Sequence, residues 1–284
     1  MHGRVQTKLI VNFAPTGMLP TKGRTPHVPI TPAEIAADVH ACARHGVSMV
    51  HLHARDEQGH PATRKEIFGD TIGRIREQHP DLVLVASTSG RTNQEASQRA
   101  EVLDLEGALK PDMASLTLSS LNFNREASLN SPELILRLAG RMQDRGIKPE
   151  LEVFDLGMVN YAHYLIKKGL LTPPYYFNII LGNIAAAQAK LLHLGLMVSE
   201  LPPDSYWSVG AVGDAQLAMN TVGIACGDGI RVGIEDNIYF DENRTVLATN
   251  PALVERVRHI ADVMGRPVAT GQDVRRMLNL QPAE

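Results

Sequence analysis

The sequence predicts a (β/α)8 TIM barrel that forms a single domain over residues 1–284. Eight short apolar segments alternate with segments of helical periodicity, and the chain has the usual length for eight such units. Most of the apolar segments are continuous, as expected for parallel strands that are buried on both faces. The alternative is a doubly wound open sheet, which would place a G-x-G-x-x-G turn after the first strand. The sequence there reads APTG at 14–17 and lacks this motif.

The first predicted strand, 8–13, is followed by a long loop rich in Pro, Thr and Lys. Loops of this length between a strand and a helix are often functional. Thr31 then suits the N-cap of a helix, because Pro32 fits the first helical position and Glu34 can complete a capping box. Gly46 suits the end of this helix.

The other units follow the same alternation. The second strand lies in the stretch 47–56, and further strands are expected at 82–86, 112–118, 149–154, 175–181, 206–209 and 229–234. Helices are expected at about 64–78, 94–105, 132–145, 157–168, 185–193, 214–226 and 251–264, with a short last helix at 273–278.

The composition is that of an ordinary globular protein, with 44% hydrophobic and 21% charged residues. A net charge of −3 gives no electrostatic reason to expect nucleic acid or an anionic membrane as a partner. The chain has no signal-peptide-like run and no apolar segment of membrane-spanning length, so we expect a cytoplasmic protein. Cys42 and Cys226 lie in helical stretches and are expected to be buried, unpaired thiols.

Two histidines end the second predicted strand. Side chains alternate along a strand, so His51 and His53 lie on the same face and can both reach one ion. An H-x-H pair alone is not specific, and two histidines that hydrogen-bond within the core would satisfy the same pattern. Residues on the other strands are therefore needed to distinguish a metal site from two histidines that hydrogen-bond within the core.

The eighth strand provides the complementary groups. Arg231 and Glu235 alternate onto the face that points into the barrel, and even-numbered strands contribute to the same layer of the interior. Glu235 can then join His51 and His53 in a metal site that keeps open positions, as catalytic sites do. The alternatives are a surface acid at Glu235 and an interior ion pair at Arg231. Asp236 can act as a base of modest strength, or only orient a neighbour.

Polar residues also end the third and fourth strands. Ser87 and Gly90 follow the third strand, and Ser115 and Thr117 lie on one face of the fourth. Hydroxyl and backbone N–H groups at these positions suit a bound carboxylate, although each residue taken singly is more often a turn or cap residue.

Two acids alternate inward on the fifth strand, which is otherwise apolar. Because a buried acid needs a partner, at least one of Glu150 and Glu152 should face Arg231 or the substrate. Asn178 on the sixth strand can play a similar part.

Together these motifs resemble the β-keto acid cleavage enzymes over nearly the whole chain. The matching segments are PITP at 29–32, HLHARD at 51–56, STSG at 87–90, KPDMA at 110–114, LNF at 121–123, PELEV at 149–153, IKKG at 166–169 and RVGIEDN at 231–237. The resemblance implies a homotetrameric TIM-barrel enzyme that converts a β-keto acid and acetyl-CoA into acetoacetate and a new acyl-CoA. No phosphate loop that would hold the CoA is evident.

The resemblance also implies roles for individual residues. Zn²⁺ would be held by His51, His53 and Glu235, although the same donors suit Fe²⁺, Mn²⁺ or Co²⁺. Asp236, paired with Arg231, matches the base of the family. The positions that hold the substrate carboxylate correspond to Ser87, Gly90 and Ser115.

The first loop departs from the aminohexanoate-cleaving members of the family. Those enzymes have a Glu two residues after the loop glycine, where it receives the substrate ammonium, whereas here Gly17 is followed by Met18 and Leu19. The sequence therefore predicts a β-keto acid with an apolar or neutral chain rather than a cationic one. Arg91 makes an anionic chain the second possibility.

Two other functions fit parts of the pattern. A metal-dependent hydrolase or lyase of a small carboxylate substrate can also use H-x-H in a barrel, but amidohydrolases place it on the first strand with further histidines on strands five and six. Here those strands carry Glu152 and Asn178. A binding barrel with a structural metal is disfavoured by the open coordination sphere and the neighbouring base.

Overall fold

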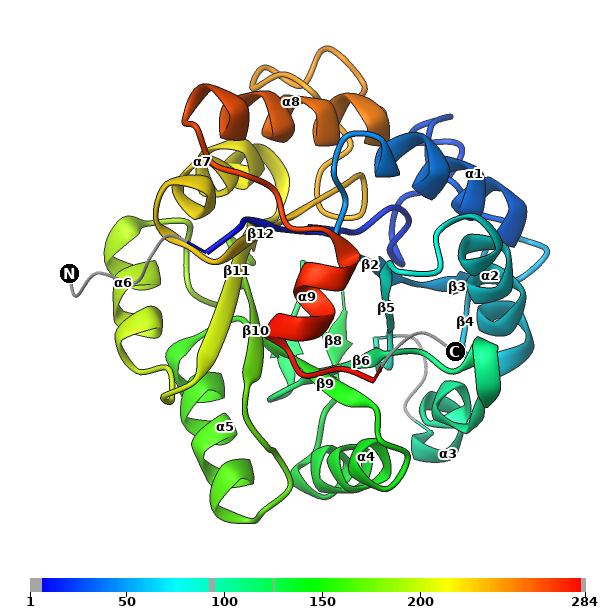
Figure 1. Ribbon diagram of the computed structural model, residues 1–284, viewed down its shortest axis with the longest axis vertical. Helices are drawn as coiled ribbons and strands as arrows, with labels where there is room; N and C mark the ends of the chain where they lie inside the picture. The colour runs from blue at the N-terminus through cyan, green and yellow to red at the C-terminus, as the bar shows by residue number, and fades with distance from the viewer. Residues whose placement is uncertain (1–6, 92–94, 125, 282–284) are drawn as a thin grey trace.

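Eight parallel strands close into a barrel in the computed structural model, which describes residues 7–91, 95–124 and 126–281 (Figure 1). Going round the barrel, the strands follow the order β1, β12, β11, β10, β9, β6, β5 and β2. Their bounds are Ile10–Phe13 (β1), Met49–Leu52 (β2), Val83–Ala86 (β5), Met113–Thr117 (β6), Lys148–Val153 (β9), Tyr175–Leu181 (β10), Ser205–Ala211 (β11) and Gly229–Val232 (β12). The predicted TIM barrel is confirmed.

Helices surround the barrel (Figure 1). The main ones are Pro32–Ala43 (α1), Lys65–Gln78 (α2), Pro132–Asp144 (α4), Leu156–Lys167 (α5), Leu191–Ser199 (α6), Gln216–Cys226 (α7) and Asn250–Val263 (α8), with the shorter Ala96–Arg99 (α3) and Gly271–Met277 (α9). Thr31 caps α1 through the predicted capping box with Glu34. Within the described residues no helix combines the length and the apolar character of a membrane span.

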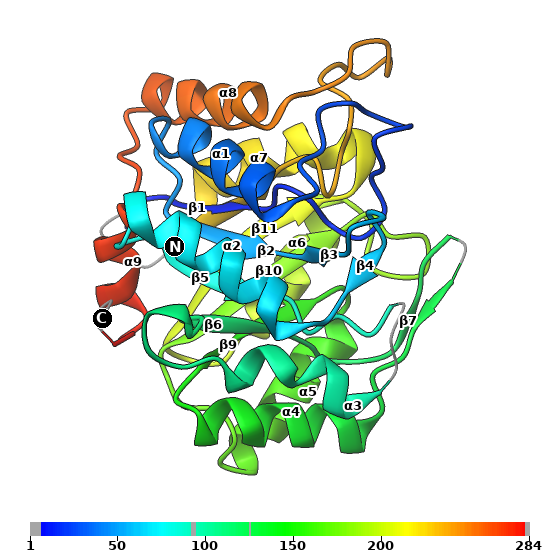
Figure 2. The same ribbon diagram turned by 90° about the vertical axis from the view of Figure 1, so that its right-hand side faces the viewer.

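Two short antiparallel hairpins extend from one end of the barrel, opposite α9 (Figure 2). One pairs β3, Ala54–Arg55, with β4, Pro61–Ala62. The other pairs β7, Leu121–Asn122, with β8, Ala127–Ser128. Both follow the carboxyl ends of barrel strands, so they surround the end where barrel enzymes form their sites.

The predicted helix at 94–105 is wrong in its extent. The helical residues are Ala96–Arg99, followed by a 3-10 turn at Glu101–Asp104, while residue 94 lies outside the described residues. The buried Arg99 side chain donates to the carbonyl oxygens of Thr88 and Leu129. These contacts fix the segment against neighbouring loops, which the local pattern does not reveal.

The predicted helix at 185–193 is also wrong, because α6 begins only at Leu191. The preceding loop satisfies its backbone in another way: the Gln188 side chain donates to the carbonyl oxygens of Asn183 and Ala186, and the Ala187 amide donates to that of Phe154. The prediction that Cys226 is buried is wrong as well. It is the last residue of α7 and is exposed, whereas Cys42 is buried as expected.

An apolar cluster fills the amino-terminal half of the barrel interior. Its barrel members are Ile10, Met49, Val83, Val85, Met113 and Tyr176. Val274 and Leu278, in and just after α9, complete this cluster, and α9 lies across this end of the barrel (Figure 1). Because this end is closed by apolar packing, the chemistry must occur at the other end.

Asn250, at the start of α8, connects three parts of the carboxyl end. Its Oδ1 accepts from the Ile234 amide at 2.8 Å, and its Nδ2 donates to the Pro15 carbonyl at 2.9 Å and to Asp38 Oδ2 at 2.5 Å. These bonds hold the loops after β1 and β12 together against α1. Burial raises the pKa of Asp38 to about 6, although its bond from Asn250 opposes this.

Replacing Asp38 by Asn should stabilise the protein in a pH-dependent way. The raised pKa means that the folded state binds a proton more readily than the unfolded state, so stability is lost as the pH rises from the ordinary pKa of 3.8 to about 6, and the full loss is present above this range. We expect a gain of at most ~3 kcal/mol at pH 8 and about half of this at pH 5. Urea unfolding of both proteins measures it, and an equal gain at both pH values would contradict this explanation.

Candidate active site

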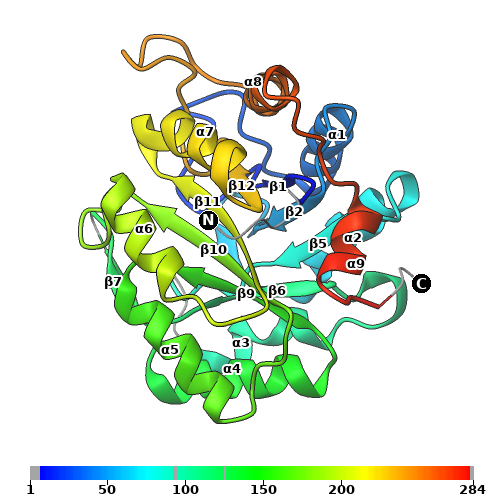
Figure 3. The ribbon, with the colours of Figure 1, turned by 60° about the vertical axis from the view of Figure 1, so that its left-hand side comes forward.

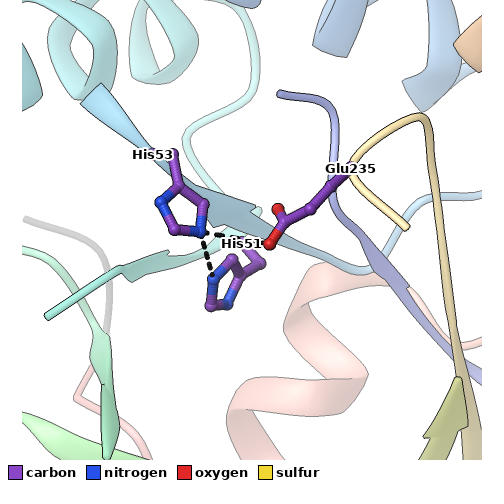
Figure 4. Close-up of side chains that lie close together, drawn as sticks. All are labelled: His51, His53 and Glu235. Carbon is purple, nitrogen blue, oxygen red and sulfur yellow. Dashed lines mark hydrogen bonds and ion pairs between the residues drawn. The ribbon is translucent and has the colours of Figure 1, made fainter. Parts of the chain in front are cut away.

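His51 and His53 meet Glu235 at the carboxyl end of the barrel (Figure 4). His51 lies in β2, His53 is the first residue after Leu52, and Glu235 is in the loop after β12. Nε2 of His51 and Nε2 of His53 are 3.3 Å apart, and Nε2 of His53 is 3.1 Å from Oε1 of Glu235. The structure thus brings together the three side chains that strand alternation predicts.

Two glycines allow Glu235 to occupy this position. At Gly17, with φ +64, an added Cβ would lie 2.5 Å from Cγ of Glu235. At Gly233, a Cβ would lie 2.0 Å from the carbonyl oxygen of Ala14. The loops after β1 and β12 are therefore packed more closely than any side chain at these positions would permit.

Arg231 points into the barrel and pairs with Asp236, as expected, but it also pairs with Glu235, so the alternative of an interior ion pair at Arg231 is present beside the candidate metal ligands. Its Nη2 lies 2.6 Å from Oε1 of Glu235, and its Nε lies 2.8 Å from Oδ2 of Asp236. Burial alone would raise the pKa of Glu235, but Arg231 and then His53 hold it well below its usual range. For Asp236 burial outweighs Arg231, so its pKa is raised and its carboxylate is a stronger base than the arginine contact alone would suggest.

Glu150 and Glu152 both face the barrel interior, and Glu152 lines the cavity at this end of the barrel, as predicted for at least one of the two acids. Glu150 Oε2 lies 2.6 Å from Nδ1 of His51, so this acid contacts a histidine rather than Arg231. Glu152 accepts from the Thr117 hydroxyl at 2.7 Å. Burial raises the pKa of Glu152, whereas His51 lowers that of Glu150 despite burial. Burial would lower the pKa of His51, but the charge of Glu150 raises it to about 9.

The charges and donors of the site suit a divalent cation. Four buried or nearly buried acids face one guanidinium and two imidazoles; they are Glu150, Glu152, Glu235 and Asp236. This leaves an excess of negative charge that is costly without a cation. Oε2 of Glu235 is buried and has no hydrogen-bond partner within the described part of the chain. Two imidazole nitrogens and a carboxylate are ligands that Zn²⁺ and related ions accept.

A cavity of about 680 Å³ opens above these residues. The predicted residues that line it are Ser87, Thr117, Glu152, His53, Arg231, Glu235 and Asp236, and its apolar wall comprises Met18, Leu19, Leu121, Phe123, Phe154, Ile180 and Ile184. A second cavity, of about 740 Å³, lies at the amino-terminal end of the barrel and includes none of the predicted site residues. The cavity above His53 and Glu235 combines an apolar wall with the predicted polar groups, as ligand sites do.

Two of the predicted substrate-binding residues do not line this cavity. The Ser115 hydroxyl is buried and accepts from the Thr88 amide at 3.2 Å. Gly90 packs so closely against Arg99 that an added Cβ would lie 2.2 Å from Nη1. Both residues shape the loop that carries Ser87, and their direct contact with a substrate remains a prediction.

The sequence reasoning missed how Arg91 is held at the cavity wall. Its Nε lies 2.8 Å from Oε1 of Glu126, and its guanidinium carbon lies 3.5 Å from the centre of the Phe123 ring. Glu126 and Phe123 belong to the β7–β8 hairpin, whose strands have two residues each. Strands this short have no periodicity from which they could be predicted.

Asn12 is the other group that the sequence reasoning missed. It lies on the inward face of β1, two residues after Ile10, and its Nδ2 donates to Glu150 at 2.7 Å. Alternation along β1 was the available signal. The short apolar run around Asn12 concealed it, because the amide is a single polar residue in an otherwise apolar strand.

A closed β/α barrel with two histidines, two acids and an arginine at one end of a cavity defines a TIM-barrel enzyme whose site suits a metal ion. The model of the beta-keto acid cleavage enzyme family matches residues 8–280, and the chain belongs to this family. The resemblance read from the sequence is confirmed. Membership favours C–C bond cleavage over the hydrolase and structural-metal alternatives.

Named relatives cover nearly the whole chain. The 3-keto-5-aminohexanoate cleavage enzyme of Fusobacterium nucleatum is 37% identical over 96% of this chain and 98% of its own length. The 3-oxoadipate:acetyl-CoA acetyltransferase of Cupriavidus necator is 33% identical over 97% of this chain and 96% of its own. Among solved structures, the complex of ObcA with a C4-CoA adduct and oxalate has a TM-score of 0.78 at 22% identity, over 91% of this chain and 68% of that one. That likeness supports the fold.

Gly17→Ala should destabilise the protein more than Gly169→Ala. Both glycines have positive φ, +64 and +71, but an added Cβ at Gly169 meets no heavy atom within 4 Å, whereas at Gly17 it meets Glu235. We expect about 1 kcal/mol from backbone strain in each variant, and about 1–3 kcal/mol more from the collision in Gly17→Ala. Denaturant unfolding compares them, and equal losses would show that the contact with Glu235 is not tight.

Proposed function

We propose that this protein is a metal-dependent acyltransferase that exchanges acyl groups between a β-keto acid and acetyl-CoA. A β-keto acid R–CO–CH₂–COO⁻ and acetyl-CoA would give R–CO–CoA and acetoacetate. Family membership and the acetyl-CoA transferase names of relatives support the reaction class. The observation that carries the proposal is the group formed by His51, His53 and Glu235 beside Arg231 and Asp236 at the base of a single cavity.

We assign the metal to His51, His53 and Glu235, and propose Zn²⁺ as the ion. When bound, the ion would polarise the β-keto oxygen and stabilise the negative charge that develops during C–C bond formation and cleavage. Asp236 is assigned as the base that takes a proton from the carbon between the keto and carboxylate groups. The Nε of Arg231 contacts the Asp236 carboxylate and so orients this base.

The substrate carboxylate is assigned to the polar side of the cavity. Ser87 lines the cavity and offers a hydroxyl donor. Arg231 also lines it, and its buried Nη1 has no acceptor among the residues that the structure describes. Ser115 and Gly90 are proposed to support this loop, with Thr117 and Glu152 beside it.

The side chain of the keto acid is proposed to be apolar or neutral. Met18 and Leu19 line the cavity where a cationic substrate would require an acid, and Leu19 is 47% exposed. The positive charge of Arg91 is matched by Glu126, and the guanidinium is covered by Phe123. The wall thus disfavours a cationic chain, whereas Arg24, which also lines the cavity and is exposed, keeps an anionic chain as the second possibility.

We also propose that the protein acts in the cytoplasm as a homo-oligomer, a tetramer by resemblance. The helix α6 lies beside α5 on the outside of the barrel (Figure 3). Three leucines of α6 are exposed. They are Leu191, Leu192 and Leu196. An exposed apolar surface of this kind is suited to contact between subunits.

His51→Ala should abolish both activity and metal binding. The variant removes one of three proposed ligands, so acetoacetate formation from a β-keto acid and acetyl-CoA should fall by at least about 10³-fold, as expected when a catalytic metal is lost. Enzyme assay and elemental analysis of the purified protein measure the two effects. A metal-free variant that keeps full activity would refute the metal-dependent mechanism.

The wild-type protein should turn over β-ketohexanoate better than 3-keto-5-aminohexanoate or 3-oxoadipate, because the latter two have charged chains. Leu19→Glu should raise the relative kcat/KM for the amino substrate by about 10-fold or more, through a charge-assisted contact of about 1.5–3 kcal/mol. Leu19→Gln is the control, because glutamine has nearly the shape and polarity of glutamate but carries no charge. Preference of the wild type for the amino substrate would refute the proposed neutral chain.

A further inference from the structure

Glu150 is a fully buried acid that contacts the candidate metal site without lining the cavity. It lies on β9 with its side chain inside the barrel. Its Oε2 lies 2.6 Å from Nδ1 of His51, and its Oε1 accepts from Nδ2 of Asn12 at 2.7 Å and from Nδ2 of Asn178 at 3.1 Å. The carboxylate thus has hydrogen-bonding neighbours on three other strands, β2, β1 and β10.

The hydrogen-bond network around Glu150 has a fixed direction. An ionised carboxylate only accepts hydrogen bonds, so every partner of Glu150 must donate. Asn12 donates to Glu150 and also to the Tyr176 hydroxyl at 3.2 Å, and this hydroxyl donates to Ser208 at 2.7 Å. His51 must therefore present a proton on Nδ1, so Nε2 is the ring nitrogen whose lone pair can serve a metal ion.

The free nitrogen points to the other proposed ligands. Nε2 of His51 lies 3.3 Å from Nε2 of His53, on the side where Glu235 also lies (Figure 4). Because His51 and Glu150 are both buried, the ring cannot turn over without breaking the 2.6 Å contact. A ring held in this way loses little conformational freedom when it binds a metal, and its nitrogen is made more basic by the carboxylate behind it.

We propose that Glu150 is the positioning residue that fixes the tautomer and orientation of His51, so that Nε2 is presented to the metal. This inference rests on the proposed metal site and extends it to a residue that is not a ligand there. A second grouping, of His51, Glu150 and Glu152, is also close enough to hold an ion. In that grouping Glu150 would be a ligand itself, but its two oxygens already serve His51 and two amide groups.

The tautomer can be measured in the wild-type protein. In zinc-loaded protein labelled with ¹³C and ¹⁵N, with the His51 ring signals assigned by through-bond correlation to its backbone, Nδ1 should carry the proton and Nε2 should have the shift of a metal-bound nitrogen. A metal-bound Nδ1 with a protonated Nε2 would overturn the proposal. This measurement needs no change at Glu150 and therefore does not depend on whether a variant folds.

Zinc affinity then tests the role of the carboxylate. Glu150→Gln should bind Zn²⁺ about 10–100-fold more weakly than the wild type in competition with a chelator, as is usual when a group that orients a ligand is lost. Glu152→Gln is the matched control, because Glu152 lies on the same face of the same strand but does not contact Nδ1. Its zinc affinity should fall clearly less than that of Glu150→Gln, because it loses the same charge near the ion but no contact with Nδ1.

The outcomes separate this inference from the proposed function. Equal zinc affinity in Glu150→Gln and the wild type would overturn the positioning role alone. Loss of affinity in Glu152→Gln, with none in Glu150→Gln, would place the ion next to Glu152 and also overturn it. A wild-type protein that binds none of Zn²⁺, Mn²⁺, Fe²⁺ and Co²⁺ would overturn the metal-dependent function together with this inference.

Discussion

The site depends on the balance of charge inside the carboxyl half of the barrel. Four buried or nearly buried acids surround a buried arginine and two histidines at the base of the cavity. Such a group would be strongly destabilising if each charge stood alone. Arg231 compensates two of the acids, His51 a third, and Thr117 donates to the fourth. The remaining negative charge supports the proposal that the site holds a divalent cation.

The backbone that carries these charges is held by packing between distant parts of the chain. Asn250 joins the loops after β1 and β12, and Gly17 and Gly233 let those loops approach each other. At the other end, α9 completes the apolar interior. The apolar half of the barrel therefore stabilises the fold, whereas the polar half contains buried charges that destabilise the fold but form the candidate site.

Much of the site follows from strand alternation, because alternation decides which side chains face the interior. It correctly predicts that His51, His53, Arg231 and Glu235 converge. It does not predict the contact of Glu150 with His51, since strand register across the barrel determines which inward residues meet. The loop before α6 was missed because Gln188 and the Phe154 carbonyl satisfy its backbone, and these contacts depend on tertiary structure. The pairing of Arg91 with Glu126 depends on a hairpin too short to be recognised locally.

The contact between Gly17 and Glu235 has a consequence for how the family can diversify. Gly17 is held against a proposed metal ligand, so the backbone of the first loop has little freedom to vary. Leu19, two residues later, lines the cavity and is half exposed. A single substitution at position 19 can therefore change the charge that an incoming keto acid meets, while the loop keeps its course and the chemical centre stays intact. Substrate preference can therefore change through single substitutions at position 19, while the residues of the proposed metal site stay the same.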